Sequence, residues 1–299
     1  MPLLGIDIGG TSTHVVVCDD ALTVLAEDVA PTPRGGPAML TTAAGLSRGL
    51  LARFPDVDAA GVAAAGVLDP ATGTIVRASD SFHDWEGTAV AVDLGRALGL
   101  PVAVDNDVNC FLLGEVAAGA LVGAVAAVGI TLGTGVGGAL WSDDRILHGL
   151  RGGAGEIGHL PGFGDLLCTC GQRGHLETLA SGPSIARQYR ATAGGDDAVS
   201  AADVATRARA GDAAARRVLH EAGTALGTAI VASTRLLGAD RVVVGGGVAG
   251  AWDLLEPAVT ATTDLAPPLF GDPLLVTPTR LGRSAVAVGA AALAAGARD

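Results

Sequence analysis

The chain of 299 residues contains no lysine, so all 19 of its basic residues are arginine. A P-loop nucleotide site needs a lysine after its second glycine, and a protein kinase needs one on its third strand. Both classes are therefore excluded. A nucleotide triphosphate would have to be held by backbone amides, threonine hydroxyls and a metal ion.

Aromatic residues are also scarce, at 3% of the chain, and acidic residues outnumber basic ones, giving a net charge of -12. The core must therefore be built from Ala, Val and Leu. Nucleic acid is not expected as a partner, because binding its phosphates requires clustered Lys and Arg. One group of arginines is interpreted as the exposed face of helices: Arg207, Arg209, Arg216 and Arg217.

Cysteine is limited to Cys18, Cys110, Cys168 and Cys170. The last two are too close in sequence for an ordinary disulfide staple, and nothing else indicates a disulfide framework. The chain enters an apolar run at Leu3 without a basic region or a signal sequence. We therefore expect a cytoplasmic protein.

Charge is absent from residues 116–142, a run long enough to span a bilayer. The run contains seven glycines, however, at positions 119, 123, 129, 133, 135, 137 and 138. A lipid-facing helix does not tolerate this pattern. We predict instead the end of a helix, a buried strand, a phosphate loop and a second strand, and no membrane partner.

Alternating strand and helix patterns along the chain predict an α/β architecture, with a boundary near residues 118–125. The predicted strands are Leu3–Ile8, His14–Cys18, Leu22–Val29, Ala60–Ala65, Val102–Val104, Arg241–Val244 and Leu274–Val276. The predicted helices are Gly36–Phe54, Thr88–Leu98, Asn106–Ala118, Pro183–Thr192, Ala201–Ala210, Asp212–Leu237 and Ser284–Ala295.

Three glycine-rich loops stand out: D-I-G-G-T at 7–11, T-L-G-T-G-V-G-G at 131–138 and V-G-G-G-V at 244–248. Glycine lets the main chain approach a phosphate closely and point its N–H groups at the oxygens. The loops therefore predict a nucleotide site.

Two of these loops also match the dinucleotide pattern G-x-G-x-x-G, starting at Gly133 and Gly245. That pattern requires a following helix and an acidic residue about 20 positions later. A strand follows the first match, and the second lacks the acidic residue. A dehydrogenase is thus the less favoured alternative.

The polar segment D-N-D-V-N at 105–109 lies where a buried strand meets a helix. The helix dipole favours an ionised carboxylate there, which could accept a proton. A simple helix cap is the alternative, because Asn and Asp are strong N-caps. The segment contains more polar residues than a cap requires, which favours a catalytic role.

A third polar group follows in a glycine-rich region: His159, Cys168, Cys170 and His175. Their intervals could close a tetrahedral zinc site. Two free cysteines and two surface histidines are the alternative.

Together the motifs run in the order D-x-G-G-T, D-N-D-x-N, L-G-T-G-x-G-G, G-G-x-G-E-x-G-H, C-x-C-G-x-x-G-x-x-E and G-G-G-V. This series closely resembles the ROK family of sugar kinases and repressors over nearly the whole chain. The resemblance implies a two-lobed actin-like ATPase (ribonuclease H-like) α/β fold with an interlobe cleft. Residues 1–118 with the C-terminal helix 284–299 would form one lobe, and residues 119–283, with a zinc loop at 159–175, the other.

The resemblance also implies roles for individual residues. Asp107 would be the base that takes the proton of a sugar hydroxyl. Sugar hydroxyls would be bound by Asn106, Asp107, Glu156, His159 and Glu177. ATP with Mg²⁺ would be bound by Asp7, Gly9, Gly10, Thr11, Gly133, Thr134, Gly135, Gly245 and Gly246. A structural Zn²⁺ would be bound by His159, Cys168, Cys170 and His175.

Three departures from the family pattern are visible. His175 replaces a cysteine, Asp105 replaces a glutamate, and Ala65-Gly66 replaces a proline-glycine pair near the sugar. We expect a Cys2His2 metal site and an altered substrate preference. The repressor branch carries an N-terminal helix-turn-helix, for which we expect no room before the first strand.

The expected activity is ATP-dependent phosphorylation of a hexose, with the 6-hydroxyl of glucose as the first choice. N-acetylmannosamine, N-acetylglucosamine, another amino-hexose or a cyclitol are alternative substrates. A non-catalytic sugar sensor is a further alternative. The family's habit suggests a homodimer or homotetramer.

Overall fold

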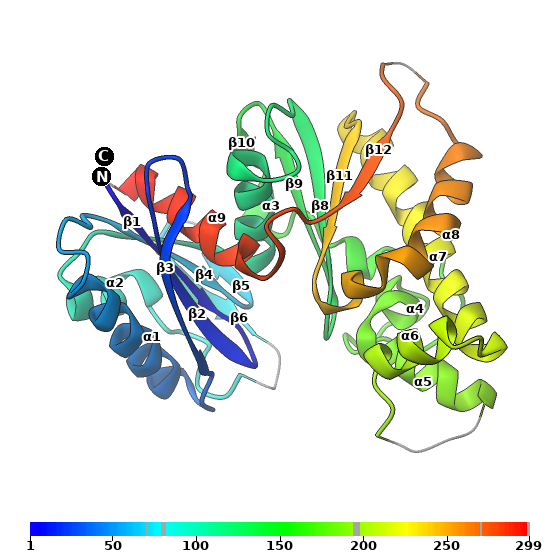
Figure 1. Cartoon of the computed structure of the whole chain (residues 1–299), viewed down its shortest axis with the longest axis horizontal. Helices are drawn as coiled ribbons and strands as arrows, with labels where there is room; N and C mark the ends of the chain where they lie inside the picture. The colour runs from blue at the N-terminus through cyan, green and yellow to red at the C-terminus, as the bar shows by residue number, and fades with distance from the viewer. Residues whose placement is uncertain (70, 79–81, 194–197, 270, 298–299) are drawn as a thin grey trace. The chain divides into compact units, whose positions relative to one another are not determined.

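The computed structural model describes residues 1–69, 71–78, 82–193, 198–269 and 271–297. These form two compact units (Figure 1). The first comprises Met1–Ala124, Asp144–Ala154 and Thr279–Asp299, and the second Val125–Asp143 and Gly155–Pro278. The chain thus leaves the first unit and returns to it twice.

The first unit is built on a sheet with the order β3-β2-β1-β4-β7. Its strands are β1 (Leu3–Ile8), β2 (Ser12–Cys18), β3 (Val24–Pro31), β4 (Ala60–Ala64) and β7 (Val102–Asn106). Strands β1, β4 and β7 are parallel, and Asp7, Ala63 and Asp105 share one register position. Because parallel strands end at the same edge, the acidic residues of β1 and β7 are brought to one end of the sheet.

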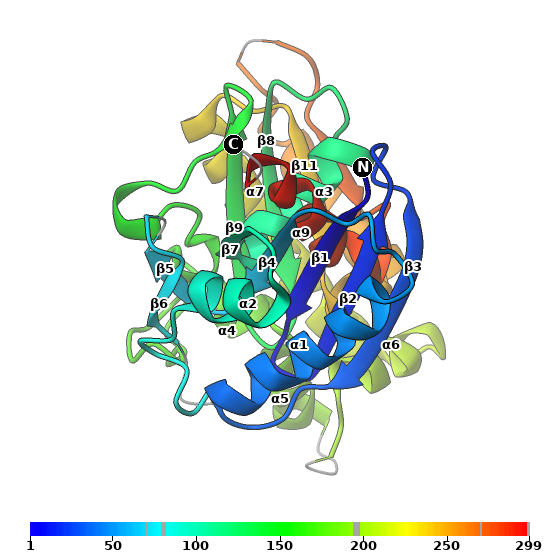
Figure 2. The ribbon, with the colours of Figure 1, turned by 90° about the vertical axis from the view of Figure 1, so that its left-hand side faces the viewer.

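Helices cover both faces of this sheet. Helices α1 (Gly36–Leu51) and α2 (Val90–Leu98) lie on the face that Figure 2 turns toward the reader. There they pack against Leu4, Ile6 and Ile8. Alternate residues of β1 point to the opposite face, where Leu3 meets α9 (Ala285–Ala294). The C-terminal helix therefore belongs to the N-terminal sheet.

Helix α9 and α3 (Asp107–Ala118) approach their neighbours at positions occupied by glycine. A Cβ at Gly289 would lie 1.7 Å from the carbonyl oxygen of Cys110 in α3. A Cβ at Gly5 in β1 would lie 1.9 Å from the carbonyl oxygen of Ala287. Main chain packs directly on main chain, so no larger residue fits without moving a helix.

The returning segment is held by a fully buried carboxylate, Glu115. It accepts hydrogen bonds from the main-chain N–H groups of Ala120 at 2.7 Å, Arg280 at 3.3 Å and Leu281 at 3.1 Å, and one from the hydroxyl of Thr279. Burying a charge is tolerated when it is fully hydrogen-bonded. Glu115 therefore joins the end of α3 to the segment that leads into α9.

The second sheet has the order β10-β9-β8-β11-β12. Its strands are β8 (Ala126–Leu132), β9 (Val136–Ser142), β10 (Arg145–Ile146), β11 (Arg241–Gly245) and β12 (Leu275–Pro278). The helices of the second unit are α4 (Glu177–Ala180), α5 (Gly182–Ala193), α6 (Ala201–Arg209), α7 (Ala213–Leu237) and α8 (Trp252–Asp264). Its core is almost wholly aliphatic, as the shortage of aromatic residues predicts.

Smaller elements complete the chain. They are the hairpin β5 (Val67–Asp69) and β6 (Thr74–Arg77), and the 3-10 turns η1 (Leu150–Gly152), η2 (Ile157–His159), η3 (Gly247–Ala251), η4 (Gly282–Ser284) and η5 (Ala295–Ala297).

Most predicted elements are confirmed to within a few residues. The uncharged run divides as expected into the end of α3, β8, a loop and β9. Among the described residues, no helix has the length and apolar character to cross a bilayer. Two differences stand out: the β5–β6 hairpin was not predicted, and α8, which contains Pro257, was not delimited.

The close approach of α3 and α9 predicts that Gly289→Ala is strongly destabilising. The added methyl overlaps a carbonyl group in the neighbouring helix, and such overpacking costs about 1–3 kcal/mol or more. Urea unfolding would measure this loss. The matched control is Gly45→Ala in α1, where the methyl meets no neighbour within 4 Å. That variant should gain about 0.5–1 kcal/mol from helix propensity. Equal stability of the two variants would contradict the packing argument.

Candidate active site

The turn from β7 to α3 presents the D-N-D segment. The Oδ1 atom of Asn106 accepts hydrogen bonds from the N–H groups of Val108 at 2.8 Å and Asn109 at 3.4 Å. Its Nδ2 atom donates to the carbonyl oxygen of Gly66 at 2.9 Å. Asn106 is therefore the helix cap. Because the capping position is filled by Asn106, Asp107 is left as the first helical residue.

Asp7 and Asp107 are two carboxylates whose pKa values are raised. Removal from water raises the pKa of Asp7 to about 8, and the charge of Asp107 adds to that rise. Removal from water also raises the pKa of Asp107, against the hydrogen bonds that its carboxylate accepts, among them the 3.0 Å bond from Val108. Asp7 can therefore hold a proton near neutral pH, and a divalent cation would favour the ionised form of both carboxylates.

The first glycine loop is the turn between β1 and β2. The N–H of Gly9 donates to the carbonyl oxygen of Ser12 at 3.1 Å, which closes the turn. Gly10 and Thr11 are exposed at its tip. A ligand phosphate could thus reach the main chain there.

The second and third glycine loops lie together in the second unit. The carbonyl oxygen of Gly133 accepts a hydrogen bond from the N–H of Gly182 at 2.8 Å. Gly246, with φ of 84°, packs on the main chain of Leu132, where a Cβ would lie 2.4 Å from the carbonyl oxygen. The loop after β8, the start of α5 and the loop after β11 are therefore held against one another.

A cavity of about 800 Å³ opens beside these loops. It is lined by Gly133, Thr134, Gly182, Pro183, Ala186, Arg190, Val199, Ser200, Ala201, Ala202, Ala205, Thr206, Arg209, Leu219, Gly247, Val248, Gly250 and Ala251. Gly245 and Gly246 do not line it; the glycines that follow them do. The Gly-Pro start of α5 was not predicted as part of the site, although Pro near a helix start is a recognisable signal.

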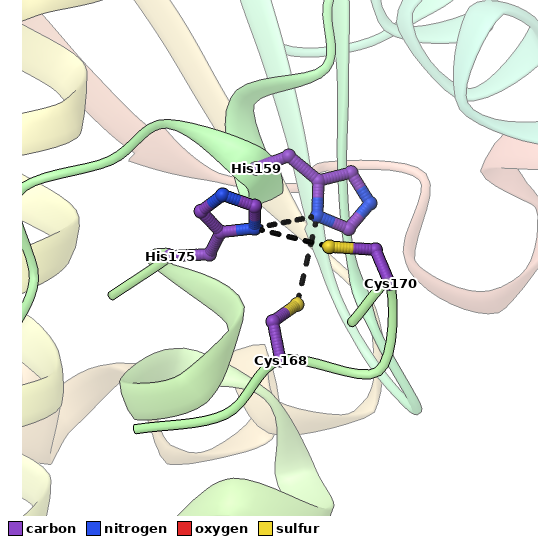
Figure 3. A group of neighbouring side chains, drawn as sticks. All are labelled: His159, Cys168, Cys170 and His175. Carbon is purple, nitrogen blue, oxygen red and sulfur yellow. Dashed lines mark hydrogen bonds between the residues drawn. The ribbon is translucent and has the colours of Figure 1, made fainter. Parts of the chain in front are cut away.

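The four predicted metal ligands lie together in one cluster (Figure 3). The Nδ1 atoms of His159 and His175 are 3.3 Å apart, Cys170 Sγ lies 3.3 Å from His175 Nδ1, and Cys168 Sγ lies 3.7 Å from His159 Nδ1. Ligands at tetrahedral zinc would be separated by roughly 3.3–3.8 Å, given ordinary Zn–N and Zn–S bond lengths. The donor set and its spacing therefore fit such an ion.

Glu177 connects this cluster to the second glycine loop. Its Oε1 atom accepts a hydrogen bond from the hydroxyl of Thr169 at 2.7 Å, between the two cysteines. Its Oε2 atom accepts one from the N–H of Val136 at 3.1 Å, just after the loop. The Sγ atom of Cys168 also donates to Oε1, at 3.7 Å, which leaves Oε2 with a further lone pair for a ligand hydroxyl.

His159 uses its two ring nitrogens differently. Nδ1 faces the other cluster ligands, whereas Nε2 lies 3.9 Å from Oε2 of the exposed Glu156. The same imidazole could hold a metal through one nitrogen and a hydroxyl-rich ligand through the other.

The predicted site residues divide between the two units. The first holds Asp7, Gly9, Gly10, Thr11, Asn106 and Asp107. The second holds Gly133, Thr134, Gly135, Glu156, His159, Cys168, Cys170, His175, Glu177, Gly245 and Gly246. Within the first unit, sequence reasoning missed His148, which contacts Asp105.

The fold and these groups define a class of α/β proteins built from two units. Glycine-rich turns follow their strands, and acidic residues lie at one end of a parallel sheet. The model of the ROK family matches residues 3–297, and the chain belongs to that family. A glucokinase from Halalkalibacterium halodurans is 34% identical over 307 residues, covering 96% of this chain and 92% of that protein. An N-acetylmannosamine kinase from Yersinia pestis is 32% identical over 274 residues, covering 88% of each.

The fold is found in solved structures of the family. A ROK family glucokinase from Streptomyces griseus, in complex with glucose and AMPPNP, has a TM-score of 0.86 to this chain at 29% identity. The match covers 99% of this chain and 100% of that one. The expected actin-like α/β fold is confirmed, and the dehydrogenase alternative is set aside.

The raised pKa of Asp7 predicts how stability depends on pH. The folded chain keeps a proton on Asp7 that the unfolded chain releases above about pH 4. Stability is therefore lost as pH rises from there toward about 8, the pKa of folded Asp7. Asp7→Asn cannot ionise, so it should raise the melting temperature of the Mg²⁺-free protein at pH 9 by roughly 5 °C. The gain should be much smaller at pH 5.

Thermal unfolding in the presence of a chelator would measure these shifts. The exposed Asp56 supplies the control, since Asp56→Asn should leave the melting temperature nearly unchanged at both pH values. An Asp7→Asn shift that is the same at pH 5 and pH 9 would argue against a raised pKa.

Proposed function

We propose that the chain is an ATP-dependent sugar kinase that transfers the γ-phosphate to a hexose hydroxyl, with the 6-hydroxyl of glucose as first choice. The observation that carries this proposal is Asp107, whose raised pKa and place at the start of α3 suit a general base. The relatives named glucokinase support the choice of sugar.

In this proposal Asp107 accepts the proton of the sugar hydroxyl as that oxygen attacks the γ-phosphorus. The bond from the γ-phosphorus to the β–γ bridging oxygen breaks, and ADP leaves with that oxygen. Such a base contributes about 100- to 10,000-fold to the rate. Asn106, Glu156, His159 and Glu177 would hold the remaining hydroxyls. Mg²⁺, bound with ATP near Asp7, would supply neutralisation of the phosphate charge.

The nucleotide is assigned to the cavity of the second unit. Its apolar lining suits an adenosine, and the main chain of Gly133 and Gly135 with the hydroxyl of Thr134 would hold phosphates. In the first unit, Gly9, Gly10 and Thr11 would do the same. The predicted partners Gly245 and Gly246 are assigned a supporting role, because Gly246 packs on Leu132.

N-acetylmannosamine is the second candidate substrate, on the strength of the Yersinia pestis relative. The Ala65-Gly66 pair bears on this choice. The carbonyl oxygen of Ala65 accepts a hydrogen bond from the indole N–H of Trp85 at 2.9 Å, and that of Gly66 accepts one from Asn106. This turn therefore positions a predicted sugar-binding residue and could shift specificity.

We also propose a cytoplasmic location, which would supply ATP and keep the thiols of Cys168 and Cys170 reduced. A homodimer or homotetramer is proposed as the assembly, and light scattering would distinguish the two.

Asp107→Asn should lower kcat by at least about 100-fold, because the amide cannot accept a proton. Sugar binding should remain within a few-fold of wild type. The measurement is coupled ADP release over a panel of sugars, with calorimetry for binding, and Asp56→Asn as the control. Failure of the folded, metal-loaded wild type to release ADP with any sugar or cyclitol would overturn the kinase proposal. Full activity in Asp107→Asn would overturn the role of this residue.

We expect about one Zn²⁺ per chain by elemental analysis. His175→Ala should reduce this content and loosen the loop that carries Cys168 and Cys170. The control is His220→Ala, which removes an exposed imidazole on α7. A wild-type protein that is metal-free yet equally stable after chelation would count against the site.

A further inference from the structure

A contact in the first unit joins the turn from β7 to α3, residues 105–109, to a segment distant in sequence. This turn, which carries Asp107, is called the catalytic turn below. The Nε2 atom of His148 lies 2.7 Å from Oδ2 of Asp105. Asp105 is buried, whereas the imidazole is partly exposed. An ionised carboxylate only accepts hydrogen bonds, so Nε2 is the protonated nitrogen that donates.

The other oxygen of Asp105 holds the turn itself. Its Oδ1 atom accepts hydrogen bonds from the N–H of Asn106 at 2.7 Å and from Nδ2 of Asn109 at 2.7 Å. These bonds fix the main chain immediately before Asp107 and the helix turn after it. Asp105 thus helps to place Asp107.

His148 also shapes the segment to which it belongs. Its carbonyl oxygen accepts a hydrogen bond from the N–H of Ala154 at 3.1 Å, which closes a loop over residues 148–154. Gly152 in this loop approaches the carbonyl oxygen of Leu68 so closely that a Cβ would lie 3.0 Å away. Glu156, a predicted sugar ligand, follows two residues after the loop.

We propose that His148 is a positioning residue that couples the 148–154 loop to the catalytic turn through Asp105. This inference rests on the proposed kinase function. His148 touches neither sugar nor nucleotide in this scheme. It restrains the Asp105 carboxylate, so that Asn106 and Asp107 keep their orientation while the loop fixes the start of the Glu156 segment.

Electrostatic attraction reinforces this contact. Asp105 raises the pKa of His148, first by accepting the hydrogen bond and also through its negative charge. Partial burial of the imidazole lowers this pKa and so opposes the rise. A charge-assisted hydrogen bond is shorter and stronger than a neutral one. The restraint is therefore stronger than that of an ordinary surface contact.

The test compares His148→Ala, His148→Gln and the exposed control His220→Ala. The alanine variant should lower kcat/KM for the sugar by about 10-fold or more, because small misplacements of reacting groups have large effects. Its KM for ATP should stay within about twofold, since the nucleotide cavity belongs to the second unit. His148→Gln keeps a donor in place of Nε2 and should recover most of the loss. His220→Ala should behave as wild type.

Amide hydrogen exchange on the same variants gives a readout that needs no substrate. His148→Ala should increase exchange in peptides covering 105–110 and 148–154, whereas His148→Gln should not. Unchanged exchange at 105–110, unchanged kcat/KM in an active enzyme, or a folded glutamine variant as impaired as the alanine variant would overturn the inference. A wild type without sugar-dependent ADP release would instead refute the kinase proposal, and exchange would still decide the coupling.

Discussion

The first unit depends on direct main-chain contact between α9, α3 and β1. This contact is made at Gly5, Gly114 and Gly289, where a Cβ would overlap a carbonyl group of the facing element. Through α9, this contact fixes the position of α3 relative to the sheet that contains β1 and β7. The position of Asp107, and with it the proposed chemistry, therefore depends on glycine at these three positions, none of which is a predicted site residue.

The proposed chemistry also depends on how the protein stabilises its acidic side chains without any lysine. The charge of Asp107 adds to the rise in the pKa of Asp7, so this pair favours a proton on Asp7. Glu115, in contrast, accepts hydrogen bonds mainly from main-chain N–H groups. Asp105 accepts one from the N–H of Asn106 and two from the side chains of Asn109 and His148. The buried carboxylates that organise the structure are thus stabilised by several hydrogen-bond donors each, and those assigned to catalysis remain able to bind a proton or a metal.

Much of this arrangement could be predicted from sequence, because glycine loops and the D-N-D segment have a local physical signature. The metal ligands were predicted as a set, and they do converge. Contacts between distant segments had no such signature. The pairing of His148 with Asp105 spans 43 positions, and nothing in the sequence around either residue indicates the other. The lining of the cavity by Gly247 and Gly250, in place of Gly245 and Gly246, depends on how β11 ends against Leu132.

The way the chain crosses between the units has a consequence for biosynthesis. Nearly all of the second unit is contiguous and emerges from the ribosome before α9. The sheet of the first unit, although made first, must wait for residues 285–294 to cover one of its faces. Because domains generally fold as they are synthesised, the second unit can become compact while the first unit is still open on one side. A chain released before α9 is made would expose the aliphatic face of the sheet that α9 covers. Such a chain would be a substrate for chaperones and proteases.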